Sequence, residues 1–150
     1  MILTLFLLLT ILVLILSVLF YHVSAVSIVQ KKHQIKFLTD IESRYSIHDC
    51  AWISEAVIER KVITVQCESA VMGIRILHFD EKGTVMAGLD LDQVHYPMAK
   101  EAFKALTGIP DFTITLSFYH DDSVYWIQSG TTEWLMSMQD FKILWKVEKQ

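Results

Sequence analysis

The sequence predicts an α+β protein: an N-terminal apolar helix followed by two tandem units, each a helix with an antiparallel sheet. Three observations lead to this fold class. The run from Ile2 to Phe20 contains no charged residue. From Tyr45 onward, apolar residues recur every second position, which is typical of strands. A helical pattern over Met98–Leu106 interrupts this alternation and divides the candidate strands into two sets of four.

The uncharged run Ile2–Phe20 is long enough to cross a membrane. Its nineteen residues would make a helix of about 28 Å, close to the roughly 30 Å hydrocarbon core of a bilayer. Tyr21 and His22 follow, and both suit the headgroup region. The first charged side chain is Lys31. We therefore expect residues 1–24 to form a transmembrane anchor, with residues 2–21 contacting the membrane.

A cleaved signal peptide is the alternative to a retained anchor, because residues 23–25 fit a small-residue cleavage site. The run lacks a basic n-region and exceeds the usual length of an h-region, which favours retention. Neither cysteine lies near it, which disfavours a lipoprotein. The charges beside the run bear on its orientation in the membrane. Lys31, Lys32 and Lys36 follow the run, and by the positive-inside rule they would place the rest of the chain in the cytoplasm.

The sequence predicts two units, residues 25–90 and 91–150, and each is a helix followed by a four-stranded meander. The first helix spans residues 25–44, with Ile28, Ile35 and Ile41 on one side. The second begins near Pro97 and ends at Gly108, a typical C-terminal cap. The candidate strands are Ile47–Val57, Val62–Glu68, Met72–Phe79, Thr84–Gly88, Phe112–Tyr119, Val124–Ser129, Glu133–Met138 and Lys142–Val147.

An internal repeat supports the division into two units, and it places both cysteines. A shift of 62 residues lays residues 62–66 on residues 124–128. Under this register, Cys67 lies opposite Trp52, and Cys50 is its diagonal neighbour on the same inward face. Two interpretations remain open. The cysteines are two buried thiols, or they form a cross-strand disulfide, which requires the register to slip by two residues.

One strand places aromatic side chains away from the predicted core. In Phe112–Tyr119, apolar and polar residues alternate. A four-residue loop would pair Phe118 with Tyr125 on the apolar face and set Trp126 beside Tyr119 on the polar face. An exposed aromatic pair on a polar sheet face is a candidate partner-binding patch. The alternative is that the other unit covers Trp126 within a shared core.

Other kinds of site receive little support. The net charge of −4 without a basic stripe argues against nucleic-acid binding. His48-Asp49 and His120-Asp121-Asp122 come nearest to ligand clusters, but neither has helix-face metal spacing. We find no glycine-rich phosphate loop and no nucleophile elbow. The sequence therefore predicts no catalytic residue, metal, cofactor or small-molecule substrate, and hence no enzyme.

Three stretches carry a resemblance to a known family: Ala99–Gly108, Val124–Ile127 and Trp134–Ile143. They are similar to the alanine-rich helix, the "VYWV" strand and the closing "FDF-x-x-G-K-I" hairpin of the PepSY-like proteins of Gram-positive bacteria. Within these, the chain resembles the TseB-like (YpmB-like) family. The closing turn here is shorter and lacks the glycine.

The resemblance implies a fold and a function. The fold would be two tandem cystatin-like units behind one membrane helix, with the N-terminus inside and the C-terminal part extracytoplasmic, opposite to the lysine bias. The function would be a non-enzymatic regulator of cell-wall elongation that binds a membrane protein of wall synthesis, such as a penicillin-binding protein. The alternative is a modulator or inhibitor of an extracytoplasmic protease.

Overall fold

The computed structural model describes the backbone of residues 2–149 and the side-chain environment of residues 11–18 and 27–149. The chain divides into two compact units, residues 1–39 and residues 40–150. Both sheets and the second helix belong to the second unit. That unit therefore holds the candidate functional surfaces.

Helix α1 (Ile2–Tyr45) is continuous along its whole length. Of the predicted apolar side of its second half, Ile28 and Ile35 are exposed and Ile41 is buried. In the part of the chain open to this test, no helix combines the length and apolarity that a membrane crossing requires. The predicted anchor, residues 1–24, falls mostly outside the residues whose side chains are described.

The first sheet is an antiparallel meander with the strand order β1-β2-β3-β4. Its strands are β1 (Ile47–Val57), β2 (Lys61–Ser69), β3 (Gly73–Phe79) and β4 (Val85–Asp90). The last turn of α1 is tied to it by Tyr45. The Tyr45 ring packs on Phe79 with centroids 5.7 Å apart, and its hydroxyl donates to the Gly83 carbonyl at 3.0 Å.

The turn between β3 and β4 occupies residues 80–84, between the two strands that the sequence predicts at Met72–Phe79 and Thr84–Gly88. The Asp80 carboxylate accepts hydrogen bonds from the backbone N–H groups of Lys82 (2.9 Å) and Thr84 (2.7 Å). These bonds hold the pKa of Asp80 below its usual range, chiefly through Thr84. Gly83 has a positive φ of 74°, which a residue without Cβ adopts without strain. A short side chain and a glycine thus set this turn locally.

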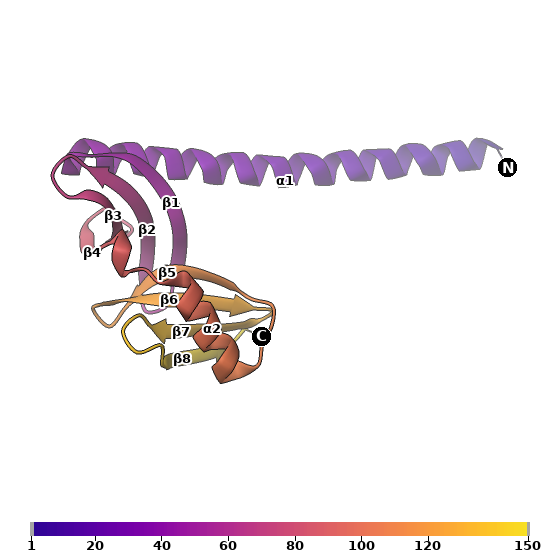
Figure 1. Cartoon of the computed structure of the whole chain (residues 1–150). Helices are drawn as coiled ribbons and strands as arrows, with labels where there is room; N and C mark the ends of the chain where they lie inside the picture. Colours follow the sequence, from indigo (N-terminus) through magenta and orange to yellow (C-terminus); the bar gives the residue numbers. More distant parts are fainter. Residues whose placement is uncertain (1, 150) are drawn as a thin grey trace. The chain divides into compact units, whose positions relative to one another are not determined.

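The second sheet is another antiparallel meander, and helix α2 lies on one of its faces (Figure 1). A 3-10 turn, η1 (Leu91–Gln93), leads into α2 (Tyr96–Thr107). As predicted, the helix has Pro97 in its first turn and ends at Gly108, whose φ is 70° and whose N–H donates to the Lys104 carbonyl at 2.8 Å. The strands are β5 (Thr113–Tyr119), β6 (Asp122–Ser129), β7 (Thr132–Ser137) and β8 (Ile143–Glu148).

One hydrophobic core joins both sheets to α2. Phe103 of α2 is fully buried, with ring centroids 4.7 Å from Phe112 and 5.2 Å from Trp134. Residues of the first sheet, Ile76 and Leu89, belong to the same cluster. The other buried members are Ala99, Leu116, Tyr125, Ile127 and Met136. The predicted α+β class is therefore confirmed, with two four-stranded sheets instead of one eight-stranded sheet or barrel across the described strands.

The register of the hairpin β5–β6 differs from the prediction. Leu116 lies opposite Tyr125, and Phe118 lies opposite Ser123. The predicted pairing of Phe118 with Tyr125 is wrong, because the connection is a two-residue turn instead of a four-residue loop. Its residues have φ values of 46° (His120) and 67° (Asp121), as in a type I′ turn, where both central residues have positive φ. A slip of two residues keeps every side chain on its predicted face.

Candidate functional site

A row of four side chains, two of them tryptophans, crosses the face of the second sheet that α2 does not cover. In register, Thr115 of β5, Trp126 of β6, Leu135 of β7 and Trp145 of β8 lie side by side. We call this row the aromatic row. Leu135 has no exposed surface, whereas both tryptophans are partly buried. Because cross-strand neighbours contact one another, the two indoles shield Leu135 and keep part of their own surface open to solvent.

The two residues predicted as a patch occupy different parts of this sheet. Trp126 lies opposite Thr115, and Tyr119 lies opposite Asp122. Four residues along β5 separate Tyr119 from Thr115, which corresponds to about 13 Å. The prediction that Tyr119 adjoins Trp126 is therefore wrong, and the two-residue turn is the reason. Tyr119 instead packs edge-on against His120, with ring centroids 4.2 Å apart.

Trp145 is the aromatic counterpart of Trp126, a role that the sequence did not predict. Trp145 and Val147 alternate along β8 with Leu144 and Lys146, so the local pattern already predicts that they share a face. That pattern says nothing about which strand residue lies beside them. The structure supplies this neighbour, because Trp145 pairs with Leu135, which in turn pairs with Trp126.

A buried carboxylate lies on the same face as the aromatic row. Glu133 pairs with Gln128 and Val147 in register and is 6% exposed. Burial acts to raise the pKa of Glu133. Hydrogen bonds from Lys149 (Nζ to Oε1, 2.5 Å) and from Gln128 (Nε2 to Oε1, 2.6 Å) outweigh it, and the pKa is lowered overall. Glu133 is therefore ionised at neutral pH and already paired, which leaves the apolar residues as the part of this face available to a partner.

Cys50 and Cys67 form a disulfide between β1 and β2. Trp52 lies opposite Val65 instead of Cys67, so the register has slipped by the two residues that a disulfide requires. The slip arises between the hairpin turn, where Val57 pairs with Lys61, and Trp52, and a register shift between Trp52 and Ser54 contributes to it. Of the two interpretations left open by the sequence, the structure contains the bonded one, and the described chain holds no free cysteine.

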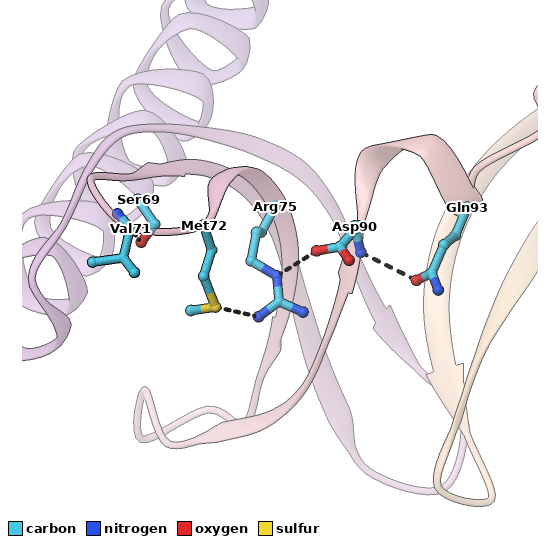
Figure 2. Close-up of polar contacts among 6 residues, drawn as sticks. All are labelled: Ser69, Val71, Met72, Arg75, Asp90 and Gln93. Carbon is cyan, nitrogen blue, oxygen red and sulfur yellow. Dashed lines mark hydrogen bonds and ion pairs between the residues drawn. The ribbon is translucent and has the colours of Figure 1, made fainter.

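Polar contacts run from Arg75 across the end of the first sheet to η1 (Figure 2). Arg75 lies opposite Cys67 on β3, and its Nε is 2.9 Å from a carboxylate oxygen of Asp90 on β4. Its Nη1 donates to Met72 Sδ at 3.2 Å. The backbone N–H of Asp90 donates to Gln93 Oε1 at 3.1 Å, which links β4 to η1. Figure 2 shows these contacts as one chain, and they tie this end of the sheet to η1.

A cleft of about 560 Å³ lies where the segment after β4 meets the second sheet. Polar and apolar side chains from several elements line it. The lining residues are Leu89, Gln93, His95, Asp122, Ser123, Val124, Ser137, Met138, Gln139 and Leu144. A cleft of this size can accommodate a small molecule or a few residues of a peptide.

Ser123 connects this cleft to a fully buried histidine. Ser123 Oγ lies 2.9 Å from His78 Nε2, and Thr64 Oγ1 lies 2.9 Å from His78 Nδ1. Burial lowers the pKa of His78 to about 4. A serine bonded to an imidazole is the geometry of a nucleophilic site, but an imidazole with so low a pKa is a weak base at neutral pH. We therefore interpret His78 as a clamp joining β2, β3 and β6.

Two hairpin tips also meet beside the second sheet. In the turn between β1 and β2, Glu59 is 3.3 Å from His120 Nε2, and Arg60 is 3.9 Å from Asp121. The Arg60 guanidinium also lies 5.9 Å from the centre of the Phe118 ring. These side chains are largely exposed, apart from Phe118. Exposed pairs of this kind contribute little to stability, and here they join the two hairpin tips.

Comparison with known proteins adds no assignment. No protein-family model matches the chain, and neither a curated protein nor a solved structure is significantly similar to it. Its function must therefore be argued from the surfaces described above and from the pattern of the sequence.

Proposed function

We propose that the chain is a membrane-anchored, non-enzymatic binding protein whose folded part lies outside the cytoplasm. Its partner would be an integral membrane protein of wall synthesis, such as a penicillin-binding protein, as the resemblance to the PepSY-like and TseB-like proteins implies. The uncharged run of residues 2–20 supports an anchor. The observation that carries the binding role is the aromatic row of the second sheet.

The disulfide supports the extracytoplasmic location. Disulfides persist in oxidising compartments and are rare in the reducing cytosol. The bond between Cys50 and Cys67 therefore outweighs the opposite bias from Lys31, Lys32 and Lys36. A single long apolar segment can insert against such a modest charge bias.

The aromatic row supports a protein partner. Tryptophans are enriched among the residues that dominate binding energy, because they bury a large area and lose few rotamers. Here Trp126 and Trp145 flank the buried Leu135 on one sheet face. A partner that covers both indoles would complete the burial that the sheet begins, with Leu135 as a rigid floor.

Crosslinking in cells tests the binding role. A photoreactive residue placed at Thr115, beside Trp126 in the aromatic row, should crosslink to an integral membrane protein of wall synthesis. Trp126→Ala should weaken this crosslink. The matched control is Leu106→Ala, which removes an exposed apolar side chain from α2 and should leave the crosslink unchanged.

Three results would count against the proposal. Equal crosslinking in the two variants would separate binding from the aromatic row. Capture of a secreted or membrane peptidase, with altered proteolysis, would favour the alternative of a protease modulator. Protection of residues beyond Lys36 from protease in intact protoplasts, with cleavage only after lysis, would place the domain in the cytoplasm and remove the wall-synthesis partner with it.

A further inference from the structure

Three side chains with metal-binding groups converge at the disulfide-bonded end of the first sheet. They are His48 and Asp49 of β1 and Glu68 of β2. One ligand atom from each, an imidazole nitrogen or a carboxylate oxygen, lies within 4.8 Å of the other two. All three residues are exposed, so an ion could reach them directly from solvent.

The β-bulge explains how neighbours in sequence reach the same place. His48 lies opposite Glu68 in the ladder. In a regular strand Asp49 would point to the other face. The register shift after His48, together with a φ of 51° at Asp49, turns its carboxylate toward the pair. Bulges commonly re-aim a side chain in this way.

The disulfide holds the two strands together directly beside these residues. Asp49 precedes Cys50, and Glu68 follows Cys67, so the covalent bond lies one residue from two of the three ligands. This arrangement fixes the spacing of the backbone beneath the cluster. A backbone that is already held in place lowers the entropic cost of bringing the ligands together.

The charges of the cluster are not balanced by the protein. Within the described residues, none of the three side chains takes part in an ion pair or hydrogen bond. Two carboxylates held near each other repel unless a cation lies between them. The imidazole distinguishes the cluster from a purely acidic one, since histidine nitrogen favours zinc and similar transition metals over calcium or magnesium.

We propose that His48, Asp49 and Glu68 bind a divalent transition-metal ion of the zinc class. Zinc bonds of about 2.0–2.2 Å to nitrogen and oxygen imply ligand atoms about 3.4 Å apart in a tetrahedral site. The present separations, none above 4.8 Å, need to close by at most about 1.4 Å, which rotation of exposed side chains supplies. Three protein ligands leave a fourth position for water or for a group of a partner protein.

Calorimetric titration of the full-length, metal-stripped protein with Zn²⁺ tests this site, with any affinity tag removed. We expect one ion per chain, and a loss of affinity of about tenfold or more in His48→Ala and in Glu68→Gln. The matched control, His95→Ala, removes an exposed histidine of the cleft and should bind as the parent does. Mg²⁺ should bind far more weakly than Zn²⁺.

Melting curves recorded without metal identify any variant that fails to fold. Glu68→Gln is the second variant because it keeps the size of the side chain and removes only the charge. The proposal is overturned if Zn²⁺ does not bind at about 1 mM. It is also overturned if His48→Ala and Glu68→Gln, both folded, bind as the parent does, or if His95→Ala alone abolishes binding. None of these outcomes depends on the aromatic row or on the membrane partner.

Discussion

Removing the disulfide should destabilise the folded unit by an amount that follows from the number of residues between the two cysteines. The change is Cys50→Ala together with Cys67→Ala. The two residues are 17 apart in sequence, and closing a loop of that length lowers the entropy of the unfolded chain by a term worth about 3 kcal/mol at 25 °C. Because the bond restricts mainly the unfolded state, the folded contacts of β1 and β2 should survive its loss.

The assay is equilibrium unfolding in urea, on the full-length protein in detergent, comparing three samples. These are the oxidised parent, the parent reduced with a phosphine, and the double alanine variant. We expect the free energy of unfolding to fall by about 3 kcal/mol in both altered samples. The reduced parent is the control, because it loses the bond but keeps both side chains.

Two results would refute the reasoning. A loss below about 1 kcal/mol would mean that the bond constrains an unfolded state that is already compact, or that it does not form. A large loss in the alanine variant, with little loss in the reduced parent, would show that packing of the buried Cys67 side chain matters instead of the bond.

Three further predictions concern single residues. The pKa of His78 is lowered to about 4 from 6.5, so the unfolded state binds more protons between these values. The free energy of unfolding should therefore fall by about 2 kcal/mol from about pH 7.5 to pH 5, and it should fall less in His78→Gln. An equal fall in the variant, measured by urea titration at both pH values, would show that His78 is not the group responsible. Trp126→Ala should lower the free energy of unfolding by about 2 kcal/mol, less than the loss of a fully buried tryptophan, because the indole is only partly buried. A loss of about 4 kcal/mol or more in thermal melts would make Trp126 a core residue and remove it from the partner surface. Gly108→Ala should cost about 1 kcal/mol, because its φ is 70°; no shift in melting temperature would show that the helix end relaxes.

The sequence alone determined the elements of this protein and their order. The period of two over Ile47–Val57 is a local property of the chain, and that strand has the predicted bounds. The same holds for the helix that ends at Gly108 and for the turn at Asp80. In each case a short segment contains both the pattern and its terminating residue, so no distant contact is needed to identify it.

Register was decided only by the tertiary structure. The turn His120-Asp121 has positive φ at both residues, but it lacks the Asn-Gly or Asp-Gly pair by which a type I′ turn is usually predicted from sequence. One change in turn length moved Tyr119 away from Trp126. In the other hairpin, Val57 lies opposite Lys61 and the register shifts between Trp52 and Ser54, which places Trp52 opposite Val65 and allows Cys50 to bond to Cys67.

The candidate sites follow the same division. Individual residues were visible in the sequence: Trp126 on an outward face, and His48 beside Asp49. Their neighbours were not, because Leu135, Trp145 and Glu68 approach them across strands whose pairing depends on turn length, bulges and a shared core. The chain's local pattern determines which side of a strand a residue occupies, while the energy of the whole fold selects the residue that lies opposite it.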